Sequence, residues 1–186
     1  MLLLIVLTGC STASVDMKYK APASVGSAAA RPLIAVGDIQ DKRPHDPRYL
    51  GAILGGYGNP LKTLESTTPV SQVVHDAFVD GLRARGLLAS STDARYILTA
   101  DIIKLDGSQY MERVAHIDFV VTLANRATGA TVYSDSFRVE LADGFTLEGG
   151  IFGSTDKLRD VVLRGMQQAI DAALDSAGVQ RAIAAG

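Results

Sequence analysis

Every second residue from 115 to 123 is apolar, and this period of two limits the fold more than any other feature. Successive side chains of a β-strand point to opposite faces, so the segment is predicted to be a strand with one buried side. Its apolar positions are Ala115, Ile117, Phe119, Val121 and Leu123. The segment that follows repeats the pattern at Tyr133, Phe137, Val139 and Leu141. The turn at 125–129 between the two segments predicts an antiparallel pair.

Two other segments carry apolar residues at the helical period. The first helix is predicted to begin with a Thr68 cap and to stop at Gly86. The last helix is predicted to open at Ser154 or Thr155 and to end at Gly178. Each helix has one apolar stripe, which indicates that each packs against a sheet.

Short apolar strands are also predicted at 33–36 and 96–103, and a long glycine-containing loop is predicted over 38–67. The predicted fold is therefore α+β, a two-layer βαβββα sandwich that spans residues 31–180. Its mainly antiparallel sheet is expected to carry both helices on one face. A chain of 186 residues is long enough to bury such a core as a single domain.

The beginning of the chain resembles a signal for lipid attachment. An apolar run at residues 2–7 precedes two small residues, as in a secretory signal, and Leu7-Thr8-Gly9-Cys10 resembles the lipobox of bacterial lipoproteins. The resemblance implies that residues 1–9 are a signal peptide and that Cys10 is acylated. The run is short and no basic residue precedes it, which indicates a start codon assigned too far downstream.

Residues 10–30 are mostly small and weakly charged, and they are predicted to form the lipidated N-terminus and a flexible tether. Ser11 stands directly after the cysteine, where an aspartate would retain an enterobacterial lipoprotein in the inner membrane. The expected location is therefore the outer membrane, with the domain held at its periplasmic face by the lipid anchor.

Composition excludes several other sites and partners. With 18 basic and 20 acidic residues, the chain is not expected to bind nucleic acid. One cysteine allows neither an internal disulfide nor a zinc site of several thiolates. His45, His75 and His116 do not have the spacing of metal ligands, so no metal and no cofactor is predicted.

His116 and Asp118 are two residues apart on the polar face of a predicted strand, where they could act as general acid and base. A solvent-facing sheet produces such pairs by default, so no catalytic residue is predicted and the chain is not expected to be an enzyme. An envelope hydrolase is kept as a second alternative function.

Apolar side chains in two glycine-rich loops are the candidates for a partner-binding surface. They are Tyr49, Leu50, Ile53, Leu54 and Tyr57 in one loop, and Ile151 and Phe152 in the other. Gly51 and Gly56 have the spacing of a phosphate-binding loop, but Tyr57 stands where that loop requires lysine.

Three short motifs resemble the YajG-type family of bacterial lipoproteins: Asp41-Lys42-Arg43, Leu50-Gly51, and residues 81–86 ahead of a block of strands. The resemblance implies a lipoprotein and supplies no catalytic residues. The architecture is also similar to auxiliary lipoproteins of ABC-type lipid transporters and to the lipopolysaccharide-assembly lipoprotein. The leading hypothesis is a non-enzymatic, lipid-anchored domain that binds an envelope protein or lipid. An auxiliary role in lipid transport or lipopolysaccharide assembly is the alternative.

Overall fold

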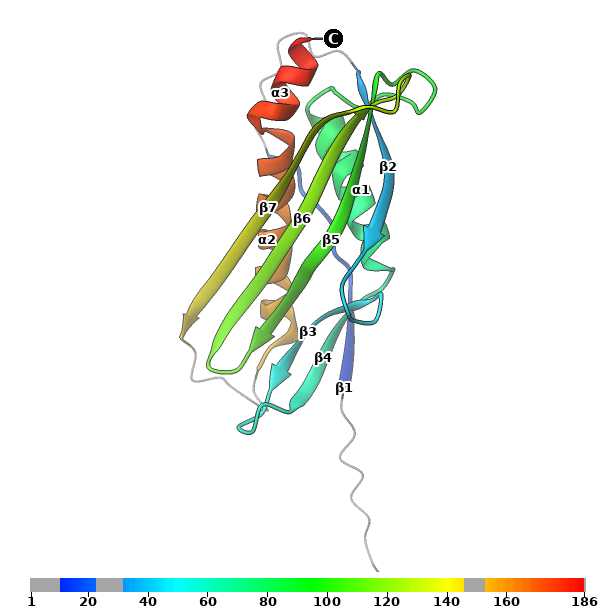
Figure 1. Cartoon of the computed structure of the whole chain (residues 1–186). Coiled ribbons are helices and arrows are strands. Elements are labelled where there is room, and N and C mark those ends of the chain that lie inside the picture. The colour runs from blue at the N-terminus through cyan, green and yellow to red at the C-terminus, as the bar shows by residue number, and fades with distance from the viewer. Residues whose placement is uncertain (1–10, 23–31, 146–152, 186) are drawn as a thin grey trace, which may run out of the picture.

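The computed structural model describes residues 11–22, 32–145 and 153–185 (Figure 1). The strands in these residues are β1 (Ser11–Val15), β2 (Ile34–Asp41), β3 (Tyr49–Leu54), β4 (Pro60–Ser66), β5 (Tyr96–Gln109), β6 (Glu112–Asn125) and β7 (Thr131–Phe145). The helices are α1 (Val70–Ala84), α2 (Thr155–Leu174) and α3 (Ala177–Ala184).

The strands of the described residues form one mixed sheet in the order β1-β4-β3-β5-β6-β7. Strand β5 is 14 residues long, and β6 pairs with it antiparallel along nearly its whole length. The other edge of β5 is shared, because β2 pairs with its first half and β3 with its last three residues, both in parallel. The predicted antiparallel run of β5, β6 and β7 is confirmed. The prediction of a mainly antiparallel sheet holds only in part, because the other half is mixed: β1 runs parallel to β4, whereas β3 and β4 pair antiparallel.

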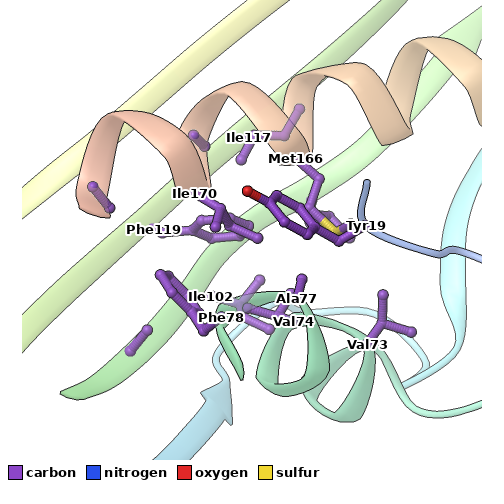
Figure 2. Packing of buried hydrophobic residues seen from close by; sticks show 14 of the residues in the cluster. Tyr19, Val73, Val74, Ala77, Phe78, Ile102, Ile117, Phe119, Met166 and Ile170 are labelled. Carbon is purple, nitrogen blue, oxygen red and sulfur yellow. The ribbon is translucent and has the colours of Figure 1, made fainter. Parts of the chain in front are cut away.

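Helices α1 and α2 lie side by side on one face of the sheet, as the two apolar stripes predicted (Figure 1). Figure 2 shows the core between them, where Phe78 of α1 and Met166 and Ile170 of α2 pack over Ile102 and Phe119 of the sheet. All five side chains are fully buried. Burial of this kind contributes about 1.5–3 kcal/mol for each large apolar side chain, so these contacts hold the two layers together.

The helix boundaries agree with the sequence at two of the four ends. Ser154 caps α2 by accepting a hydrogen bond from the Lys157 amide, and Gly86 follows α1 in a left-handed conformation. At the start of α1, however, Pro69 occupies the capping position and no side chain caps the helix. Helix α2 ends at Leu174, before the predicted Gly178. The side chain of Ser176 then caps a separate helix, α3.

Gly178, which was expected to end that helix, lies inside α3. A Cβ on Gly178 would be 2.1 Å from the ring of Tyr133, so the glycine is needed for packing and not for termination.

Part of the segment predicted as a flexible tether belongs to the fold, which corrects that prediction for residues 11–22; residues 23–30 lie outside the described residues. Residues 11–15 form β1 at the edge of the sheet, paired with β4 from Ser11 opposite Lys62 to Val15 opposite Ser66. Val15, Met17 and Tyr19 are buried in the core. They alternate with charged residues at 16, 18 and 20, so the period of two was present in the sequence but too short to stand out.

The loop predicted over 38–67 is also wrong. Strand β2 continues to Asp41, and residues 49–66 form the hairpin of β3 and β4. The hairpin was missed because β3 contains Gly51, which normally weakens a strand. Here Gly51 has a φ of 147° and lies directly against Gly107 of β5, where a Cβ would be 2.1 Å from the Gly107 carbonyl oxygen.

We expect Gly51→Ala to destabilise the protein by about 2–4 kcal/mol, because an alanine would force β3 away from β5 and carry the strain of a positive φ. Chemical denaturation measures the change in the free energy of unfolding. The matched control is Gly56→Ala, where nothing lies within 4 Å of the new Cβ and the expected change is within about 0.5 kcal/mol. Equal stability of the two variants would contradict the close approach.

Candidate functional site

The structure separates the predicted partner-binding residues of the first glycine-rich loop into buried and exposed groups. Leu50 and Ile53 of β3 have no exposed surface, so the prediction that they meet a partner is wrong. Tyr49 and Leu54, at the two ends of β3, are half-buried. The physical reason is that these residues form a strand against β5, so their apolar side chains complete the core.

Tyr57 is the member of this set that stays exposed, with a relative exposure of 101%. It stands at the tip of the turn between β3 and β4, which is closed by hydrogen bonds from the Gly58 amide to the Gly55 carbonyl and from the Gly55 amide to the Asn59 carbonyl. The second predicted set, Ile151 and Phe152, lies outside the described residues.

The adjoining turn carries two further exposed apolar residues that were not predicted from the sequence. Tyr110 and Met111 form the turn between β5 and β6 and are 46% and 50% exposed. The Tyr110 hydroxyl donates a hydrogen bond of 3.4 Å to the Gly56 carbonyl, which brings the two turns together. We call Tyr57, Tyr110 and Met111 the apolar tip. The sequence feature that could have revealed Tyr110 and Met111 is their position as an apolar pair between two segments with strand-like alternation.

A buried arginine fixes the hairpin that carries Tyr57. The Arg43 side chain is 1% exposed and donates hydrogen bonds to the carbonyls of Tyr49, at 2.6 Å, and Leu105, at 2.8 Å. It also forms a two-point ion pair with Asp41, with N–O distances of 2.8 and 2.7 Å. The sequence motif Asp41-Lys42-Arg43 therefore joins the end of β2, the start of β3 and the middle of β5.

The charge of Asp41 follows from this pair. Burial by itself would raise the pKa of the Asp41 carboxyl, but the hydrogen bonds and charge of Arg43 outweigh it and the pKa is lowered. Asp41 is therefore ionised at neutral pH, and its carboxylate is the charged partner of the buried Arg43 guanidinium group.

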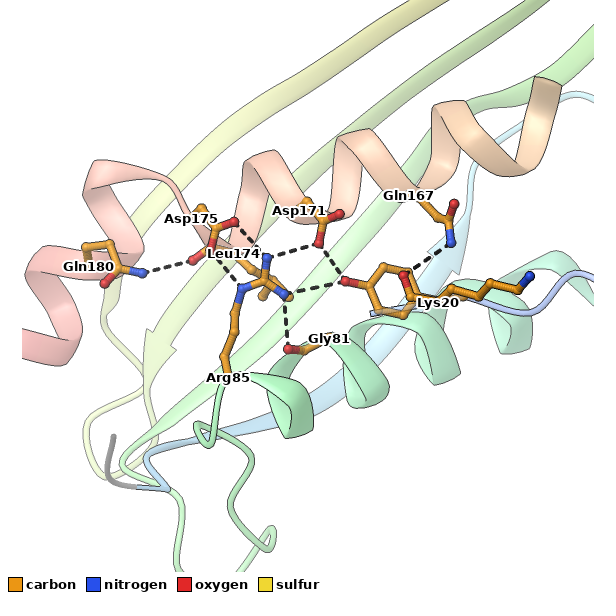
Figure 3. Close-up of polar contacts among 9 residues, drawn as sticks. Lys20, Gly81, Arg85, Gln167, Asp171, Leu174, Asp175 and Gln180 are labelled. Carbon is orange, nitrogen blue, oxygen red and sulfur yellow. Dashed lines mark hydrogen bonds and ion pairs between the residues drawn. The ribbon is translucent and has the colours of Figure 1, made fainter. Parts of the chain in front are cut away.

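A second polar network joins the helices to the segment after β1 (Figure 3). Arg85, directly after α1, pairs with Asp171 of α2 at 2.9 Å and with Asp175, directly after α2, at 2.7 Å. The Tyr19 hydroxyl donates to Asp171 at 2.5 Å, and the Gln167 amide donates to the Lys20 carbonyl at 3.3 Å. These bonds hold residues 19 and 20 against both helices, so the network serves the fold.

A hollow of 390 Å³ lies between residues 16–19 and the outward side of α1. Its charged lining residues are Asp16, Lys18, Asp76, Asp80 and Arg83. Both signs of charge are mixed along its walls, so its electrostatics favour no class of charged ligand.

His116 and Asp118 lie on the sheet face opposite the helices, as predicted, but each is paired across to β7. Asp118 accepts hydrogen bonds of 2.8 Å from Ser136 and from Arg138, and the His116 ring nitrogen is 3.7 Å from the Glu140 carboxylate. The acid of the hypothetical catalytic pair is therefore held by an arginine instead of orienting the histidine. This arrangement suits a stabilising cross-strand contact.

Metal binding and membrane spanning find no support in the part of the chain that the structure describes. Its histidine, aspartate and glutamate side chains form no cluster of three that could hold a metal ion. None of its helices combines the length and apolar character needed to cross a bilayer.

Comparisons with known proteins identify the fold. No protein-family model and no curated protein matches the sequence. A Xanthomonas campestris protein of family DUF330 has a similar structure, with a TM-score of 0.67 and 12% identity over 94% of this chain and 99% of its own. An uncharacterised protein aligns over the same shares, with a TM-score of 0.54 and 14% identity. At these identities the similarity shows the fold alone.

Structural matches also include a Caulobacter crescentus protein described as a lipoprotein. It covers 62% of this chain and 84% of its own, with 12% identity and a TM-score of 0.43, which is too low to define a shared fold. The similarity to the DUF330 protein therefore shows the fold, and membership of the YajG-type family stays a prediction.

We expect Arg43→Leu to lower the free energy of unfolding by about 3–5 kcal/mol, because it leaves the Asp41 charge and two buried carbonyls without their partner. Denaturant titration followed by circular dichroism measures the loss. The matched control is Arg83→Leu, which breaks an ion pair with Asp80 on the exposed side of α1 and should cost less than about 1 kcal/mol. Similar losses for both variants would show that the buried bridge has no special role.

Burial and the bond to Asp171 raise the pKa of Tyr19 to about 12. A phenol whose pKa is higher in the folded state stabilises the fold fully below the unfolded value of about 10, and the stabilisation is lost as pH rises toward about 12. The free energy of unfolding should therefore fall less steeply in Tyr19→Phe than in the wild type between about pH 10 and 12, as measured by urea titration. Tyr57→Phe, at an exposed position, should keep the wild-type slope. A wild-type slope in Tyr19→Phe would contradict the prediction.

Proposed function

We propose that this chain is a lipid-anchored, non-enzymatic binding domain of the bacterial envelope, attached through Cys10 to the outer membrane and facing the periplasm. The observation that carries the proposal is the position of Cys10 in the chain. It ends a lipobox-like sequence, and the next residue, Ser11, begins a strand of the folded sheet. The acylation site and the domain are thus adjacent, and three acyl chains on Cys10 would hold the domain at the bilayer surface.

The contacts around His116 and Asp118 support a binding role over a hydrolase. A general base needs an orienting partner within hydrogen-bond reach, but Asp118 is occupied by Arg138 and Ser136. The short motifs shared with the YajG-type family support membership of a lipoprotein family, and we include that membership in the proposal. The proposed binding partner of the domain is an envelope protein or a lipid.

Fatty-acid labelling tests the anchor. We expect cells grown with a fatty-acid analogue to label the wild-type protein, and Cys10→Ala to lose the label and to leave the membrane fraction. The matched control is Ser11→Ala, which keeps the thiol and should be labelled and membrane-bound as the wild type is. An unlabelled wild type, or a labelled Cys10→Ala variant, would refute the anchoring.

A further inference from the structure

The start of β1 and the apolar tip lie at the same end of the molecule. Ser11 pairs with Lys62 near the beginning of β4, and β4 begins directly after the turn that carries Tyr57. Figure 1 shows the start of β1, the β3–β4 turn and the β5–β6 turn together at one end of the sheet, while α3 lies at the other end. Any lipid on Cys10 is therefore attached beside the apolar tip.

The distance between a lipid on Cys10 and this end of the sheet is limited by covalent geometry. Cys10 is joined to Ser11 by a single peptide, and one residue extends the chain by at most about 3.6 Å. Since Ser11 is fixed by strand pairing, the bilayer cannot lie far from this end of the sheet. Among the described residues, the side chains that face the bilayer then include those of the two turns.

These side chains have the chemistry of a membrane interface. Tyr57, Tyr110 and Met111 are three of the large apolar residues exposed on the described surface. Tyrosine combines an apolar ring with a polar hydroxyl, and such side chains are enriched at the level of the lipid headgroups. The turn residues 55–59 and 110–111 contain no charged side chain, and the exposed Glu112, which begins β6, is the charged residue that adjoins Met111.

We propose that the apolar tip enters the headgroup region of the bilayer that holds the Cys10 lipid, so that the sheet stands end-on on the membrane. The proposal rests on the proposed lipid anchor and adds an orientation to it. The acyl chains supply the attachment, and the three side chains decide which way the domain points. Because the tip lacks lysine and arginine, its insertion does not depend on anionic lipids.

Tryptophan reporters test the orientation, because the protein contains no tryptophan of its own. The acylated full-length variant Tyr57→Trp is placed in phosphatidylcholine vesicles with and without brominated acyl chains, which quench a nearby indole. The matched control is Val132→Trp, at the start of β7, where the side chain is 47% exposed at the opposite end of the sheet. Cosedimentation with the vesicles is measured for both variants.

We expect brominated lipid to cause roughly a twofold loss of emission from Tyr57→Trp, as for a side chain about 5–10 Å into the interface, and no loss from Val132→Trp. Exchange of a third of the lipid for phosphatidylglycerol should leave this result unchanged.

If both variants bind the vesicles and neither is quenched, the proposed orientation is wrong, although the proposed anchor is not refuted. A blue-shifted but unquenched Tyr57→Trp, whose shift depends on protein concentration, would assign the tip to contact between copies and also overturn it. Failure of both variants to sediment, with no acyl group found on Cys10 by mass spectrometry, would refute the proposed anchor and the orientation with it.

Discussion

The arrangement of the sheet depends on the hydrogen bonds that the Arg43 guanidinium group donates to two strands. Strand β5 is longer than either strand that pairs with its outer edge, so β2 leaves that edge before β3 reaches it. The Leu105 carbonyl lies in this interval and is satisfied by Arg43, which also holds the Tyr49 carbonyl at the start of β3. A buried carbonyl without a partner costs about 1–3 kcal/mol, so the bridge lets two short strands share one long edge.

The same bridge sets the position of the apolar tip. Because Arg43 fixes where β3 begins, it fixes the direction of the hairpin and places Tyr57 beside the turn of Tyr110. Strand β1 then joins the free edge of β4, and Tyr19 is held between the helices by Arg85 and Asp171. The segment that connects the proposed lipid to the domain is therefore a structural element, which is why an anchored domain would have a defined orientation.

Local patterns were sufficient to predict half of this fold and little of the candidate site. The β6–β7 pair and the two long helices carry long, regular patterns, and β6 and β7 are neighbours both in sequence and in space. Strands β1, β3 and β4 are five to seven residues long, and apart from the β3–β4 hairpin their pairings are with strands distant in sequence. A short apolar run with a glycine predicts a loop as well as a strand, and it was the packing of Gly51 on Gly107 that decided between them.

By itself, the sequence determined the layers of the fold and the one residue suited to carry a lipid. Periods of two and 3.6 residues depend only on the local geometry of strands and helices, and a lipobox is a contiguous motif. Tertiary structure alone decided that Leu50 and Ile53 are core residues while Tyr57, Tyr110 and Met111 are surface. Burial depends on what packs against a side chain, and Leu50 and Ile53 belong to a strand that packs against β5 and α2, which lie far from it in the sequence.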